Sequence, residues 1–163
     1  MSHAPEEYAA LIQELALAWE HVEGQFAKNR RIDAKIPEAA EDEMKRAALG
    51  YTIHNLYNAM ENYLVRVAKF FENRLDDPSW HKDLVDRMAL SIEGVRPAVL
   101  PRELRRDIHE LRSFRHVFRN IYDTELDSKR VEQANQLVGR VVEGFRTAHG
   151  LFTRKLEEIR AGL

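Results

Sequence analysis

The chain has 163 residues, 44% apolar and 32% charged, and its 25 basic and 27 acidic side chains give a formal charge of −2. The absence of cysteine excludes disulfides and thiolate metal sites, and no apolar run is long enough for a transmembrane helix or signal peptide. A pI near 6.4 provides no overall attraction to nucleic acid, so any RNA binding requires a local basic patch.

The first predicted helix covers residues 5–29. Pro5 suits the first turn, and the acidic residues after it favour the positive end of the helix dipole. The polar stretch 28–33 then indicates a connection, with its basic residues at a solvated helix end. Apolar residues recur at the three- or four-residue spacing of a buried stripe: Tyr8, Leu11, Leu15, Trp19, Val22 and Phe26.

The second predicted helix covers residues 37–73 and opens at Pro37. Gly50 interrupts its apolar stripe and permits close contact with another helix. Asn58 and Glu61 border one polar face, where they are either surface groups or part of a cleft, and Glu61 is suited to orient an arginine from elsewhere in the chain.

A short helix is predicted over residues 80–91, after the turn signal Asp77-Pro78. Gly94, Pro97 and Pro101 then indicate a loop, which is followed by a helix that continues to about residue 119. The last predicted helix runs from about residue 129 to residue 159, with apolar residues again at helical spacing.

Five amphipathic segments with modest loops predict an all-α fold, an up-and-down bundle of four long helices plus one short helix. We expect residues 1–163 to form a single domain, because this length suits one hydrophobic core. Without a membrane-spanning segment, we also expect a cytoplasmic protein.

The helix after Pro101 carries most of the positive charge. Residues 102–119 include six arginines against three acidic residues, a net charge of +3. Arg115 and Tyr122 fall on the apolar face of this helix, and Arg119 lies beside that face. An arginine on a buried stripe is either salt-bridged or lines a cleft. The spacing leaves both interpretations open; in a cleft, such a cluster can bind phosphate.

Motifs of several other enzyme classes are missing from the sequence. No histidine follows an acidic residue at the Glu-x-x-His spacing of two-metal bundles, and no zinc motif, phosphate-binding glycine loop or Gly-x-Ser-x-Gly elbow occurs. We therefore expect no metal and no cofactor. His21, His81 and His149 are interpreted as surface or capping groups.

Residues 112–122, Arg-Ser-Phe-Arg-His-Val-Phe-Arg-Asn-Ile-Tyr, resemble the signature of HEPN-domain proteins of the HepT-like toxin group, as do residues 54–62 and 80–84. The similarity covers roughly residues 45–130. The group's motif is an arginine, four residues, a histidine, one residue and a tyrosine. Arg115 and Tyr122 match this motif, whereas Asn120 occupies the histidine position.

The resemblance implies a metal-independent endoribonuclease, the toxin of a toxin–antitoxin pair, with its active cleft between the two protomers of a homodimer. It also implies a partner, a minimal nucleotidyltransferase antitoxin, which adenylylates the motif tyrosine, here Tyr122.

In such a cleft, arginines bind phosphate oxygens and a histidine transfers protons. His116 and Asn120 lie about 40° apart on a helix, so both can address one cleft, although an asparagine cannot titrate. The expected catalytic residues are Arg115, His116, Arg119 and Asn120, and the expected substrate-binding residues are Arg112, Asn58 and Glu61.

Two alternatives to a ribonuclease stay open. The first is a catalytically inactive HEPN module that binds nucleotide or RNA, or scaffolds a nucleotidyltransferase; Asn120 favours it, because it removes the titratable group of the motif. The second is a bundle that only mediates oligomerisation, in which the arginines are salt-bridged.

Overall fold

Five helices account for most of the structure, a computed structural model that describes residues 3–35, 43–72, 79–121 and 125–163. The predicted all-α fold is confirmed, because these residues contain no strand beyond an isolated antiparallel bridge between Ile92 and Arg96. The helices are α1 (Pro5–Lys35), α2 (Glu43–Phe71), α3 (Trp80–Met88), α4 (Leu104–Arg119) and α5 (Ser128–Ala161).

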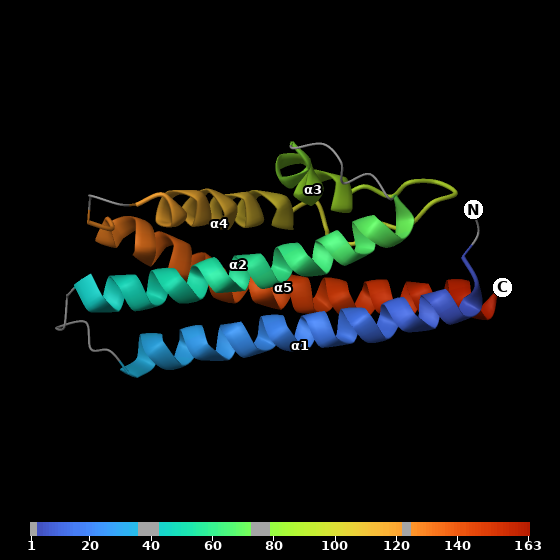
Figure 1. The fold of residues 1–163 in the computed structure, drawn as a ribbon, viewed down its shortest axis with the longest axis horizontal. Helices are drawn as coiled ribbons and strands as arrows, with labels where there is room; N and C mark the ends of the chain where they lie inside the picture. The colour runs from blue at the N-terminus through green and yellow to red at the C-terminus, as the bar shows by residue number, and fades with distance from the viewer. Residues whose placement is uncertain (1–2, 36–42, 73–78, 122–124) are drawn as a thin grey trace.

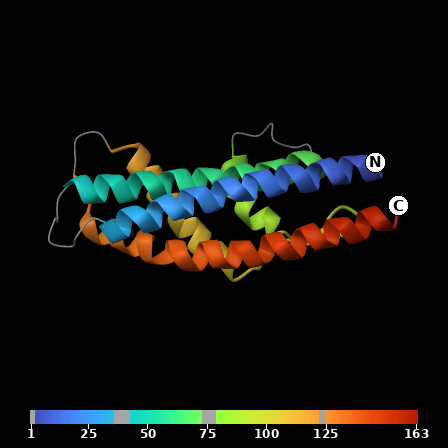
Figure 2. The ribbon, with the colours of Figure 1, turned by 90° about the horizontal axis from the view of Figure 1, so that it is seen from below.

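The four longer helices run up and down beside one another, with α2 in the middle of the bundle (Figure 1). Both α1 and α4 pack against α2 and α5, and the short α3 lies on α2 and α4. The start of α1 and the end of α5 lie at the same end of the molecule, as the view from below also shows (Figure 2).

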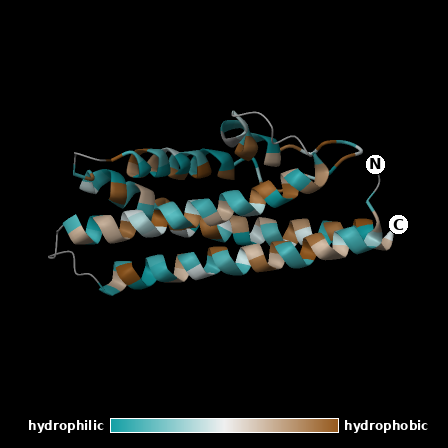
Figure 3. Ribbon diagram, in the orientation of Figure 1, coloured by the Kyte–Doolittle hydropathy of each residue, from teal (hydrophilic) through white to brown (hydrophobic). Residues whose placement is uncertain are grey.

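One hydrophobic cluster joins all five helices, and it includes the apolar stripes predicted from the sequence. At its centre, the indole of Trp19 stacks on Phe145 with ring centroids 5.6 Å apart, and Tyr63 meets the same ring edge-on at 5.1 Å. Apolar and polar residues alternate along each helix, as expected where one face is buried and the other is wet (Figure 3).

The predicted connection at residues 28–33 is wrong, because α1 continues through it to Lys35. Asn29 is fully buried there, and its amide nitrogen donates to Thr52 Oγ1 on α2 and to Asn135 Oδ1 on α5, each at 2.9 Å. Arg30 donates to the Asn135 carbonyl at 3.2 Å. The helix continues through this polar stretch because neighbouring helices provide partners for its side chains.

The interpretation of His149 as a surface or capping group is also wrong. Its ring is half-buried, stacks on Trp19 at 5.5 Å and shares a 2.8 Å hydrogen bond with the Tyr63 hydroxyl. Burial lowers the pKa of His149 and raises that of Tyr63, so both groups are held in their neutral forms. His21 is exposed, in agreement with the prediction.

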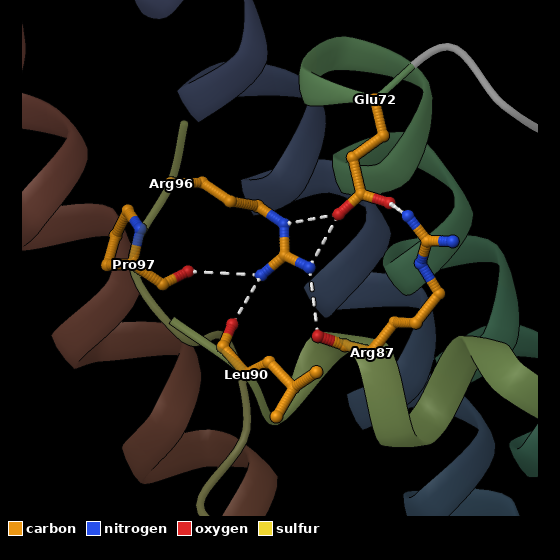
Figure 4. A network of polar contacts seen from close by, with 5 residues as sticks. All are labelled: Glu72, Arg87, Leu90, Arg96 and Pro97. Atoms are coloured by element: carbon orange, nitrogen blue, oxygen red, sulfur yellow. Dashed lines mark hydrogen bonds and ion pairs between the residues drawn. The ribbon is translucent and has the colours of Figure 1, made fainter. Parts of the chain in front are cut away.

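A buried arginine fastens the loop after α3 to the end of α2 (Figure 4). The Arg96 side chain is 0% exposed, and its guanidinium donates to Glu72 Oε1 from Nε at 2.9 Å and from Nη2 at 2.7 Å. It also donates to the carbonyls of Arg87, Leu90 and Pro97. Since Arg87 pairs with the second oxygen of Glu72, the buried charges are compensated.

We expect Arg96→Met to destabilise the protein by about 3–5 kcal/mol, because Glu72 Oε1 and the carbonyls of Leu90 and Pro97 lose the donors that Arg96 supplies. Arg160→Ala is the control: it breaks the exposed Arg160–Glu157 pair and should cost about 0–1 kcal/mol. Urea denaturation followed by circular dichroism measures both. Equal stability of the two variants would contradict a structural role for Arg96.

Candidate functional site

The candidate site lies where α4 crosses α2. The Phe118 ring, at the end of α4, packs directly over Gly50, where a Cβ atom would lie 2.7 Å from Phe118 Cε2. Glycine therefore allows the two helices to approach closely, which confirms the contact role expected for Gly50. This approach brings the polar face of α2 within hydrogen-bonding distance of Arg115 on α4.

Arg115 reaches from α4 to two residues of α2. Its Nη1 donates to Asn58 Oδ1 at 2.8 Å and approaches Glu61 Oε1 at 3.3 Å. Its guanidinium carbon lies 4.9 Å from the centre of the Tyr57 ring, a cation–π contact. The Arg115 and Glu61 side chains are only 16% and 9% exposed, so α4 presents this arginine to the interior, as its place on the apolar face predicts.

One edge of the Arg115 guanidinium is left for another partner. Both contacts with α2 use Nη1, whereas the buried Nε has no hydrogen-bond partner among the residues that the structure describes. Nε and Nη2 form a fork that matches two oxygens of a phosphate or carboxylate. Arg115 is thus fixed through Nη1, and its buried Nε has no partner in the described part of the chain.

His54 belongs to the same cluster; it lies in the family-like stretch 54–62, but the sequence assigns it no role. Its Nε2 lies 3.1 Å from Asn58 Nδ2, and its ring centroid lies 5.7 Å from that of Phe118. Burial, followed by the charges of Arg115 and Arg119, lowers the pKa of His54. The helical spacing of His54, Asn58 and Glu61 was visible in the sequence, but the position of α4 opposite them was not.

The other predicted residues of α4 lie at the margin of this cluster. Arg112 donates from Nε to His109 Nδ1 at 3.3 Å and is half-buried, whereas His116 and Arg119 are exposed. Asn120 ends α4, and its amide donates to the His116 carbonyl at 2.8 Å. The structure therefore unites Asn58, Glu61 and Arg115 and leaves His116, Arg119 and Asn120 on the solvent side. Tyr122 lies outside the described residues.

No group of three or more potential metal ligands occurs among the residues described here. Their helices also include none that is long and apolar enough to cross a membrane. The polar groups of the site are the Arg115 guanidinium, the Asn58 amide, the Glu61 carboxylate and the His54 imidazole.

Replacing Gly50 should test the close contact of α2 and α4. We expect Gly50→Ala to lose about 1–3 kcal/mol, because the new methyl group displaces the Phe118 ring. The matched control is Gly24→Ala on α1, where nothing lies within 4 Å of the added Cβ and a helical alanine should add about 0.5–1 kcal/mol. Thermal unfolding compares them, and a stabilised Gly50→Ala would contradict the tight contact.

Comparison with known proteins gives one match. The family model described as HepT-like protein matches residues 48–156, from the first half of α2 to the last turns of α5. A search of curated proteins and a search of solved structures gave no significant match. The matched range covers more than half of the chain and contains the α2–α4 cluster, that is His54, Tyr57, Asn58, Glu61 and Arg115. It also agrees with the resemblance seen in the arginine-rich segment. The chain therefore belongs to the HepT-like family of HEPN-domain proteins.

Proposed function

We propose that this protein is the toxin of a toxin–antitoxin pair, an endoribonuclease that cuts RNA at the α2–α4 cluster without a metal ion. The observation that carries the proposal is Arg115, which Asn58 and Glu61 hold while its buried Nε has no partner in the described part of the chain. Membership of the HepT-like family supports the same proposal.

A fixed arginine can stabilise the negative charge that develops on the phosphoryl oxygens when RNA is cut. The ribose 2′-hydroxyl attacks the adjacent phosphorus, and negative charge grows on the phosphoryl oxygens. A donor that is already oriented stabilises this charge without reorganising during the reaction. Asn58 and Glu61 supply that orientation through Nη1, and the fork of Nε and Nη2 supplies the donors.

Further positive charge is available beside the fork. Arg119 is exposed, and Arg112 is half-buried on the same helix. These side chains are placed to hold neighbouring phosphates of a single strand, and they give α4 the basic patch that a chain of net charge −2 requires. Of the motif residues, Asn120 cannot transfer a proton, whereas His116, next to Arg115 in the sequence, carries an imidazole.

We further propose that two copies form the complete cleft, with their α4 helices facing each other. On α2, Met44 and Tyr51 share a face with Asn58 at seven-residue spacing, and they are 76% and 61% exposed. Exposed apolar residues beside a polar cluster favour association with another surface. A two-fold interface would cover them and bring the arginines of both copies together.

Replacing the arginines should weaken RNA binding more than it changes the fold. Arg119→Ala removes an exposed charge, and Arg115→Lys keeps a cation beside Glu61 but removes the fork. We expect both to lower the affinity for a single-stranded RNA, and Arg119→Ala to reduce the slope of log K against log salt by about 0.7. Fluorescence anisotropy measures this, with Arg160→Ala as a control of equal charge. Unchanged affinity in both variants would remove α4 from the binding site.

Tyr122 is the proposed point of control by the antitoxin. Its phenolic oxygen would attack the α-phosphorus of ATP and release pyrophosphate, leaving an adenylyl group three residues after Arg119 in the chain that would block RNA and neutralise positive charge. We expect mass spectrometry to find one adenylyl adduct after incubation with the nucleotidyltransferase encoded beside this protein. Tyr122→Phe should abolish the adduct and Tyr51→Phe should keep it; an adduct that survives Tyr122→Phe would exclude this site.

The inactive binding module is the second candidate function. The observation that favours it is the amide of Asn120, which caps α4 by bonding to the His116 carbonyl and brings no titratable group to the motif. RNA that binds in a salt-dependent manner and is never cut would support this alternative over the ribonuclease.

A further inference from the structure

His54 faces the arginine cluster from the opposite helix. It lies on α2, one turn before Asn58, and its half-buried ring contacts the Phe118 ring of α4. Burial, followed by the charges of Arg115 and Arg119, lowers its pKa. His116, by contrast, is exposed and lies about 100° around α4 from Arg115.

The hydrogen bonds define the protonation state of His54. Arg115 can only donate, so the atom of Asn58 that it contacts must be the carbonyl oxygen, and the Asn58 amide nitrogen must face His54. An amide nitrogen is a donor, so His54 Nε2 accepts and the ring proton resides on Nδ1. Asn58 thereby holds the imidazole neutral, with the lone pair of Nε2 directed at the Asn58 amide that is bound to Arg115.

The surroundings favour the same neutral form. Burial and the two arginines of α4 lower the pKa of His54, and its Nδ1 is buried without a partner among the described residues. On α2 itself, the nearest acidic residue of the cluster is Glu61, which already pairs with Arg115. A neutral imidazole whose pKa lies below its ordinary value accepts protons at neutral pH.

We propose that His54, rather than a histidine of the α4 motif, is the catalytic base of this protein, accepting the proton of the attacking ribose 2′-hydroxyl. The proposal rests on the ribonuclease function proposed above. The 2′-oxygen forms a bond to phosphorus as its proton moves to His54 Nε2. The bond from phosphorus to the 5′-oxygen then breaks, leaving a 2′,3′-cyclic phosphate, and the 5′-oxygen takes a proton from water.

Asn58 has two roles in this scheme. Before substrate binds, it fixes Arg115 and His54 together. When the 2′-hydroxyl replaces it at His54 Nε2, its amide nitrogen becomes free to donate to a phosphate oxygen held by Arg115. Asn58 is therefore a positioning residue, and Asn120 can serve as a helix cap because the base comes from α2.

The first test compares cleavage rates of wild type, His54→Gln and the control His21→Gln between pH 5 and pH 9. The wild-type kcat/KM should rise with pH through a group with a pKa below about 6.5 and then level off, because only the neutral imidazole accepts a proton. We expect His54→Gln to lower this plateau by about 10²–10⁴-fold and to lose the inflection. His21 is exposed on α1, so its variant should match the wild type.

Measurements of RNA binding distinguish a catalytic role of His54 from a structural one. A 2′-O-methyl RNA, which cannot be cut, should bind His54→Gln as tightly as it binds the wild type, while Arg115→Lys binds it more weakly. In nuclear magnetic resonance titrations, the His54 ring should become easier to protonate when this RNA is bound, because a phosphate anion stabilises the imidazolium.

The outcomes distinguish the two proposals. Full cleavage by His54→Gln with the inflection retained would overturn the assignment of His54 and leave the ribonuclease in place. An unaltered His54 titration in the presence of bound RNA would also overturn it. A wild type that binds RNA but cuts none would overturn both the ribonuclease and its base.

Discussion

The central position of α2 is the constraint on which the rest of the structure depends. A helix surrounded by neighbours buries polar groups as well as apolar ones, and each buried polar group requires a partner. The partners come from different elements, so each bond fixes the position of one neighbour against α2. These pairs are Thr52 with Asn29 of α1, Glu61 with Arg115 of α4, Tyr63 with His149 of α5, and Glu72, just after α2, with Arg96 of the loop.

The same rule explains why the charged Arg115 can be half-buried. Arg115 loses hydration between two helices, and Asn58, Glu61 and the Tyr57 ring compensate for that loss on one side of its guanidinium. The cost of holding the charge is thus met by the scaffold before any ligand arrives. Arg115 therefore has a fixed orientation, unlike an arginine that is exposed and unpaired at the surface.

Much of the fold could be predicted from the sequence, because helix periodicity is a local signal. The stripe around Trp19 and the arginine-rich segment after Pro101 both form helices as predicted. The predictions are wrong where partners are distant in the chain. The polar residues around Asn29 indicate a connection, because the buried partner Asn135 is 106 positions away and gives no local signal. His54 lies in the family-like stretch 54–62, but the sequence assigns it no role, since only the folded chain brings α4 to it.

The family match begins at residue 48 and therefore excludes α1. Yet α1 supplies Trp19, which covers Phe145, and Asn29, which joins α2 to α5. A fragment trimmed to the boundaries of the match would expose these aromatic and polar surfaces to solvent. The region that the family model matches is thus smaller than the unit that packs together, and recombinant fragments or domain fusions of this protein need to retain residues 5–35.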